Sequence, residues 1–196
     1  MWKADPSVKS IGIRELFLVR TDIKAGPKDS LLDTKSTAAP IAPDTNGDFL
    51  LDFEDTPTRI PESDNHVRFD AVHTYSVVRY TFDLLLGDLE YLDGKPPVLN
   101  PPWGNKPIVI HPHAGEDANA FYSREEAALK FFYTKQNDKI IYLCRSFDVV
   151  AHEAGHFFLD ILQPQWLASG QTGGFHEAFG DLCSLFTLIS MVSIRK

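Results

Sequence analysis

The stretch that most clearly decides the fold reads Phe147-Asp148-Val149-Val150-Ala151-His152-Glu153-Ala154-Gly155-His156-Phe157-Phe158. Its apolar residues predict a buried helix from about residue 148 to residue 162. Side chains four positions apart lie on one helix face, so His152 and His156 point in the same direction. Either both histidines are hydrogen-bonded within the core, or together they bind a metal ion. Glu153 beside them favours the metal, since a carboxylate there reaches a metal-activated water without binding the ion.

A third metal ligand is expected downstream, because a catalytic zinc commonly takes three protein ligands and leaves one position open. The longer three-histidine pattern is excluded, since positions 159 and 162 are both leucine. A second motif opens a helix that is predicted from about Phe175 to beyond Leu188, and it reads Gly173-Gly174-Phe175-His176-Glu177-Ala178-Phe179-Gly180-Asp181.

Only one of the two neighbours His176 and Glu177 can face the ion, because adjacent helix positions point about 100° apart. The spacing favours Glu177, with His176 as its rival. Asp181 follows four residues later on the same face. It is either the hydrogen-bond partner of a ligating histidine or an ordinary solvated carboxylate.

The rest of the chain predicts an α+β fold. Residues 1–65 are turn-rich and form a β-rich or irregular segment, with strands expected at 11–20 and 49–53. Residues 66–196 begin with a helix from Asp70, its expected N-cap, to Gly87, and continue with strands at 108–110 and 139–144. The two helices that carry the motifs complete this second part.

Composition excludes several classes of function. The 196 residues carry 19 basic and 27 acidic side chains, and the net charge of −8 argues against a nucleic-acid partner. The longest apolar run, 185–194, is shorter than the roughly 20 residues of a membrane span. Residues 1–6 lack the pattern of a signal peptide. Cys144 and Cys183 are expected to be buried free thiols rather than a disulfide.

The two motifs together resemble those of the thermolysin-like zinc metalloproteases, the gluzincins, over roughly residues 70–190. The resemblance implies a zincin catalytic lobe in which His152, His156 and Glu177 bind Zn2+. Glu153 is then the general base toward the metal-activated water and passes the proton to the leaving amine. Asp181 is implied as the partner of a zinc-binding histidine.

The resemblance extends to Asn119-Ala120-Phe121-Tyr122, which matches an edge strand that holds an extended peptide. It implies that the Asn119 side chain and the Ala120 carbonyl bind the substrate. The expected activity is therefore that of a zinc endopeptidase acting on peptides or proteins. Secretion is implied by the resemblance alone.

The chain also departs from the family. The family's calcium site includes the position of Asp148, but residues 182–188 contain no carboxylate, which argues against calcium and leaves Asp148 as a helix N-cap. The family's oxyanion-stabilising Tyr is replaced by Trp166-Leu167, and the C-terminal helical lobe is expected to be missing. The alternative is thus a truncated or inactive zinc-binding lobe that serves as a fragment or interaction module. A metallo-aminopeptidase is less favoured, because no acidic anchor for a free amine is identified.

Two shorter motifs have simpler explanations. His111-Pro112-His113 is a possible strand-borne metal pair, but a surface loop is favoured because no acid or Cys lies at ligand spacing. Asp44-Thr45-Asn46-Gly47-Asp48 resembles the start of a calcium loop, but its glycine comes too early for an EF-hand. A turn is the expected structure there.

Overall fold

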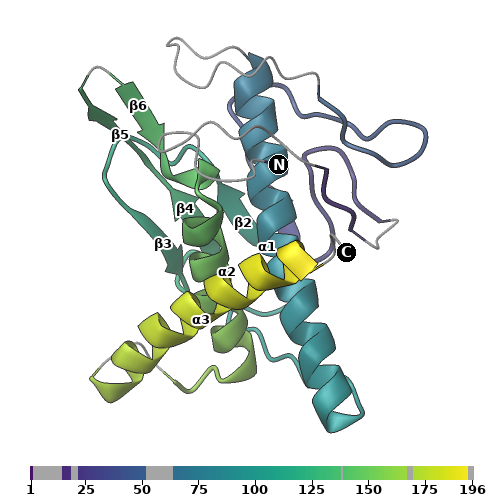
Figure 1. The fold of residues 1–196 in the computed structure, drawn as a ribbon, viewed down its shortest axis with the longest axis vertical. Coiled ribbons are helices and arrows are strands. Elements are labelled where there is room, and N and C mark those ends of the chain that lie inside the picture. The colour runs from purple at the N-terminus through teal and green to yellow at the C-terminus, as the bar shows by residue number, and fades with distance from the viewer. Residues whose placement is uncertain (2–14, 19–21, 52–63, 138, 167–169, 194–196) are drawn as a thin grey trace.

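A computed structural model describes residues 1, 15–18, 22–51, 64–137, 139–166 and 170–193. The fold is α+β, as predicted from the sequence (Figure 1). Its helices are α1 (Asp64–Asp93), α2 (Phe147–Leu162) and α3 (Gln171–Ser193), with a short 3-10 turn at Leu143–Arg145. Its strands are β1 (Leu32–Thr34), β2 (Ile108–His111), β3 (Ala120–Ser123), β4 (Ala128–Phe131), β5 (Tyr133–Gln136) and β6 (Lys139–Tyr142).

Four strands form one sheet in the order β1-β2-β4-β3. β1, β2 and β4 run parallel, with Ile110 opposite Leu129, while β3 pairs antiparallel with β4 at the edge. β5 and β6 form a separate antiparallel hairpin. β1 lies in the first predicted part of the chain, residues 1–65, and pairs with β2 of the second part, residues 66–196. The division of the chain into these two parts stays a prediction.

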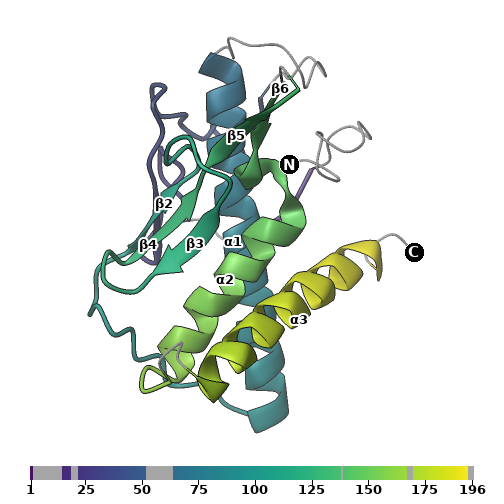
Figure 2. The same cartoon turned by 90° about the vertical axis from the view of Figure 1, so that its left-hand side faces the viewer.

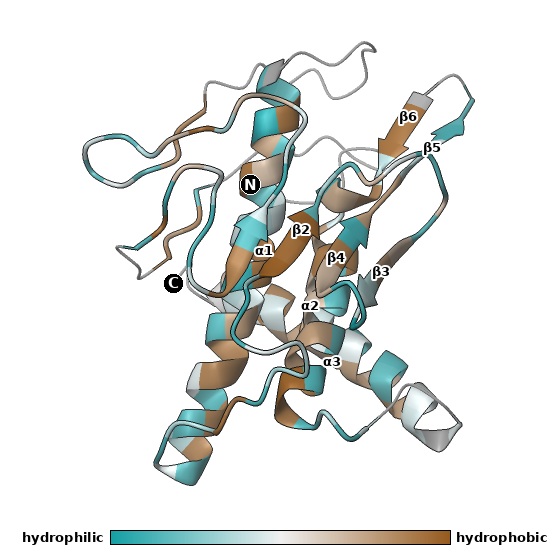
Figure 3. Cartoon of the chain, turned by 180° about the vertical axis from the view of Figure 1, so that it is seen from behind, coloured by the Kyte–Doolittle hydropathy of each residue, from teal (hydrophilic) through white to brown (hydrophobic). Residues whose placement is uncertain are grey.

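The elements stack in layers, with α2 between the four-stranded sheet and α3 (Figure 2). The apolar β2, brown in Figure 3, is buried through Ile108 and Ile110. Val150, Phe157 and Phe158 of α2 belong to the same core. The helix predicted at residues 148–162 is therefore confirmed, and its polar His-Glu-His motif lies in a largely apolar setting.

Several predicted boundaries and caps are wrong. α1 begins six residues before Asp70 and continues through Gly87, where an added Cβ would meet nothing within 4 Å. Ser146 is the N-cap of α2, and Asp148 instead lies in its first turn, where a carboxylate is favoured by the helix dipole. The predicted strand at 49–53 lies partly outside the described residues, as does that at 11–20, and residues 15–18 and 49–51 form no strand. The turn at Asp44 is confirmed, since its carboxylate accepts hydrogen bonds from the Asn46 and Asp48 amides.

Asp70 has a structural role that could not be predicted from its neighbours in the sequence. Its buried carboxylate accepts hydrogen bonds from the Arg145 guanidinium at 2.9 and 3.0 Å, and His113 Nε2 lies 2.9 Å away. Burial opposes ionisation of Asp70, but Arg145 and His113 outweigh it and keep the pKa of this carboxyl below its ordinary value. The ion pair thus fastens α1 to the turn that precedes α2.

Within the described ranges, no helix combines the length and the apolar character needed to cross a membrane.

Candidate metal centre

Two glycines allow α2 and α3 to cross closely. A Cβ added to Gly155 of α2 would lie 3.0 Å from Gly180 Cα and from Cys183 Cβ of α3. A Cβ added to Gly180 would lie 2.8–2.9 Å from ring atoms of His152. Both distances are shorter than normal carbon contacts. Because Gly155 and Gly180 have no side chains, α3 approaches α2 closely enough for Gly180 of the second motif to pack against His152 of the first.

Gly180→Ala is expected to weaken the binding of a metal ion by His152 about tenfold or more, because the new methyl group displaces the imidazole ring. Helix propensity alone would favour Ala over Gly by about 1 kcal/mol, so a loss of affinity cannot come from the helix. The matched control is Gly174→Ala, also in α3, where the added Cβ meets nothing within 4 Å. Isothermal titration with zinc checks both variants, and equal affinities for the two would contradict the close packing against His152.

His152, His156 and Glu177 form a cluster whose donor atoms all lie within 4.8 Å of one another. Glu177 Oε2 is 3.4 Å from His152 Nε2, and Glu177 Oε1 is 3.7 Å from His156 Nε2. Ligands about 2.1 Å from a tetrahedral zinc ion are separated by about 3.4 Å. Two imidazoles and a carboxylate at these separations suit zinc in both chemistry and spacing.

The hydrogen bonds around the cluster favour Glu177 over His176 as the third candidate metal ligand. His152 Nδ1 lies 2.9 Å from Asp181 Oδ1, which leaves Nε2 directed toward Glu177. A carboxylate in this position fixes the tautomer and the orientation of the imidazole. His176 is buried, and its Nε2 lies 3.0 Å from the Trp166 carbonyl, so this ring nitrogen is directed away from the cluster.

The two sides of the cluster differ in exposure. Glu177 and Asp181 are 70% and 80% exposed, so the centre is open to solvent along α3. His156 lies on the buried side, and burial lowers its pKa to about 4, with a further contribution from the adjacent His152. His156 is therefore neutral at neutral pH, which is the form that binds a metal.

Glu153 is directed toward the sheet and is only 7% exposed. Its Oε2 accepts a hydrogen bond of 2.9 Å from the backbone N–H of Tyr122 in β3. Burial raises the pKa of Glu153 to about 8 against the opposing effect of this hydrogen bond, and the nearby Glu177 carboxylate raises it further. A carboxyl group whose pKa is shifted toward neutral pH, beside a cluster of candidate metal ligands, is typical of a general base.

The predicted substrate residues lie at the β3 edge of the four-stranded sheet. The Asn119 carbonyl accepts a hydrogen bond of 3.1 Å from the Phe132 N–H on the β4 side, whereas the Tyr122 N–H points to Glu153. The backbone N–H and C=O groups of consecutive residues point to opposite sides of a strand, so those of Ala120 and Tyr122 point to the same side. The Ala120 carbonyl therefore points to the same side as Glu153, and the exposed Asn119 side chain precedes it.

A hollow of about 590 Å3 adjoins the cluster between α2 and α3. Its apolar wall consists of Val149, Leu185 and Leu188. His152, Glu153 and Asp181 form the polar side next to the donor atoms. The recess can hold an apolar side chain beside the carboxylate of Glu153.

A second group of donors lies elsewhere and includes His113 with Asp70 and Cys144. The sequence interpretation of His111-Pro112-His113 as a surface loop is wrong for His113, which packs against Asp70 from a distant part of the chain. The Arg145 guanidinium already neutralises Asp70 and would repel a cation there. The α2–α3 cluster is thus the better metal site. Cys144 and Cys183 are both buried and neither forms a disulfide, as predicted.

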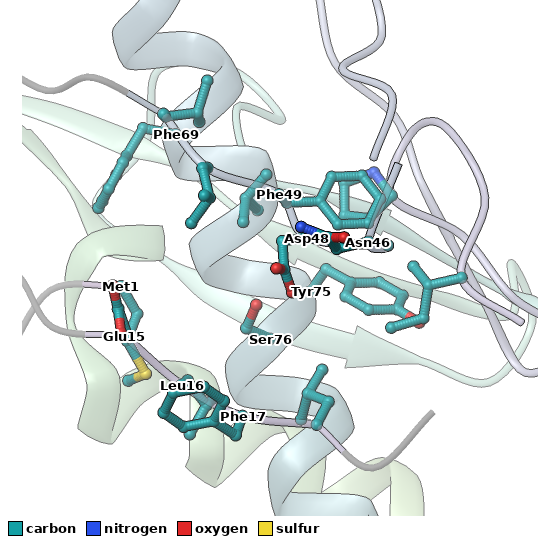
Figure 4. A pocket seen from close by; sticks show the side chains of 17 residues that line it. Met1, Glu15, Leu16, Phe17, Asn46, Asp48, Phe49, Phe69, Tyr75 and Ser76 are labelled. Atoms are coloured by element: carbon teal, nitrogen blue, oxygen red, sulfur yellow. The ribbon is translucent and has the colours of Figure 1, made fainter. Parts of the chain in front are cut away.

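A larger hollow of about 820 Å3 lies against α1 (Figure 4). Phe69, Tyr75 and Ser76 of α1 line one side, and Phe17 and Phe49 belong to the other. None of the described residues that line it belongs to the α2–α3 cluster.

Sequence reasoning brought together His152, His156, Glu177, Glu153 and Asp181, and these residues do meet in space. It missed the contact of Tyr122 with Glu153 and the packing of Gly180 against His152. Two signals were present: an aromatic residue in the predicted edge strand, and a glycine one position before Asp181 on a helix.

The sequence matches no family model and no curated protein.

Proposed function

We propose that this chain is a zinc-dependent endopeptidase with a thermolysin-like catalytic lobe. The observation that carries the proposal is the cluster of His152, His156 and Glu177, with donor atoms within 4.8 Å of one another and Glu153 adjoining it. Two imidazoles and one carboxylate are the donor set of a hydrolytic zinc site with an open position. When bound, zinc supplies a Lewis acid that activates water and polarises a carbonyl.

Glu153 carries the proton transfer in this proposal. Its carboxylate takes a proton from the attacking water and passes it to the amine of the departing peptide fragment. The Tyr122 amide holds one carboxylate oxygen, which orients the group. A cation at the neighbouring cluster favours the ionised form of Glu153, against the burial that favours the neutral form.

The substrate is an extended peptide that lies along β3 in this proposal. The Ala120 carbonyl offers a backbone acceptor on the side of Glu153, and an added strand is a general way to bind a peptide. The recess formed by Val149, Leu185 and Leu188 accommodates a side chain next to the bond that is cleaved.

The test is hydrolysis of fluorescein-labelled casein by the full chain, before and after zinc is removed with 1,10-phenanthroline. We expect hydrolysis that is lost on chelation and recovered when zinc is restored. Hydrolysis that persists in the zinc-free chain would overturn the proposal.

A second candidate is a zinc-binding module that interacts with a partner and does not hydrolyse peptides. The observation that favours it is a row of apolar side chains on α3 that are about half exposed, Phe175, Leu182, Leu185, Phe186 and Ile189. One equivalent of tightly bound zinc without hydrolysis of any peptide would support this second candidate.

A further inference from the structure

The buried carboxylate of Asp160 has no role in the proposed function so far. It lies on α2 and is 1% exposed. Asp160 Oδ2 accepts hydrogen bonds of 2.6 Å from the Tyr122 hydroxyl and 2.8 Å from Arg124 Nε, and Arg124 Nη2 donates to Oδ1. A buried charge is costly unless partners of this kind compensate it.

The partners of Asp160 come from β3 and from the turn that follows it. Tyr122 lies in β3, Arg124 is the first residue after the strand, and both side chains reach Asp160 on α2. Tyr122 also donates its backbone N–H to Glu153. This one residue of β3 therefore contacts both buried carboxylates of α2, Glu153 and Asp160.

Glu153 and Asp160 are seven residues apart on α2, which is nearly two full turns and places them on one face. The helix consequently holds β3 at two levels. At the first level Glu153 binds the Tyr122 amide, and at the second level Asp160 binds the Tyr122 hydroxyl and the Arg124 guanidinium. We call these three contacts the β3–α2 clamp.

We infer that Asp160 is a positioning residue for Glu153, acting through Tyr122 and Arg124. The clamp sets the distance between β3 and α2, and this distance determines whether the Tyr122 amide reaches the Glu153 carboxylate. The inference rests on the proposed function, since it assigns Glu153 as the general base. A displacement of about 1 Å at such a group costs as much as a hundredfold in rate.

The same inference predicts a division between kcat and KM. β3 pairs with β4 over four residues through backbone contacts that do not involve Asp160, so we expect this pairing to remain in its absence. The strand that binds the peptide therefore persists when the clamp is lost, and only its distance from Glu153 changes. Asp160→Asn is expected to lower kcat about tenfold or more and to change KM by less than about threefold.

The experiment compares Asp160→Asn, Tyr122→Phe and the double variant in the full, zinc-loaded chain. Turnover is measured with an internally quenched peptide that the wild type cleaves. Because both single changes break the same clamp, we expect the double variant to lose little more than either single variant. The matched control is Glu126→Gln, which removes an exposed ion pair with Lys130 in β4 and should leave kcat unchanged.

A second readout does not depend on turnover. Hydrogen exchange of the Tyr122 amide, followed by NMR, is expected to be slow in the wild type and faster in Asp160→Asn. The Phe132 amide, which donates to the Asn119 carbonyl, should stay protected in both and so reports that the sheet is intact. A purely structural Asp160 would speed the exchange of both amides together and leave kcat of the folded chain unchanged.

Two results separate this inference from the proposed function. An active wild type whose kcat and Tyr122 exchange are unchanged by Asp160→Asn would overturn the inference alone. Absence of hydrolysis by the wild type would overturn the proposed function and the inference with it.

Discussion

Glu153→Gln is expected to lower kcat/KM by a factor of about a hundred to ten thousand. The amide has almost the same size as the carboxylate and can still accept a hydrogen bond from the Tyr122 amide. It cannot take a proton from water, so general-base catalysis is lost while the shape of the site is kept. Zinc content should stay at one equivalent, because Glu153 is not among the clustered donors.

The matched comparison for this result is His156→Ala, which removes one of the donors. We expect this variant to lose both zinc and hydrolysis, so that only Glu153→Gln separates the binding of metal from catalysis. Metal analysis by mass spectrometry and hydrolysis of casein measure the two properties on the same samples. Full activity in Glu153→Gln would show that another group moves the proton.

Arg145→Met is expected to destabilise the fold by about 3 to 5 kcal/mol at neutral pH. The substitution leaves Asp70 as a buried carboxylate without its bidentate partner, with His113 as the neighbour that remains. Removing one member of a buried pair costs more than the pair itself contributes. Urea unfolding, followed by circular dichroism, measures the loss of free energy.

Lowering the pH is expected to change the stability of the wild type and that of Arg145→Met in opposite directions. In the wild type the pKa of Asp70 is lower in the folded than in the unfolded chain, so the pair stabilises above about pH 4 and this contribution disappears as the pH falls further. Without Arg145, burial raises the pKa of Asp70, and the folded variant takes up a proton more readily than the unfolded one. Its stability should therefore increase between pH 7 and pH 5.

Lys135→Met serves as the control for this prediction. Its partner is Glu116, and both side chains are more than half exposed, so we expect a much smaller loss. The double variant Asp70→Asn, Arg145→Met should recover part of the stability, since no buried charge remains. A loss after Arg145→Met no larger than that of Lys135→Met would contradict the assignment of the pair as buried.

The long periodic segments of the fold could be predicted from the sequence. α2 and α3 were expected because apolar residues recur at helical spacing, and β2 was expected from Ile108-Val109-Ile110. β1 and β4 were not expected, since each is a short strand whose pairing depends on distant partners. Asp70 was predicted as the N-cap of α1 but lies within the helix, where its carboxylate pairs with Arg145, a residue 75 positions away that local capping rules do not detect.

The cluster of His152, His156 and Glu177 could be predicted because its residues follow fixed spacings on two helices. His152 and His156 share a face of α2, and Glu177 and Asp181 share a face of α3. The spacing of residues along the chain gives no information on contacts between separate elements. The hydrogen bond between Tyr122 and Glu153 and the contacts of Asp160 join a strand to a helix across 31 to 38 positions, so they became visible only in three dimensions.

The central claim is that zinc binds between His152, His156 and Glu177. X-ray absorption at the zinc edge of the zinc-loaded chain tests it most directly, because sulfur ligands lie about 2.3 Å from zinc and nitrogen or oxygen ligands about 2.0–2.2 Å. We predict a shell of nitrogen and oxygen only, with the outer-ring scattering of two imidazoles, and no bound zinc in His156→Ala. A sulfur ligand would instead point to the group of Asp70, His113 and Cys144, and would contradict the site at α2 and α3.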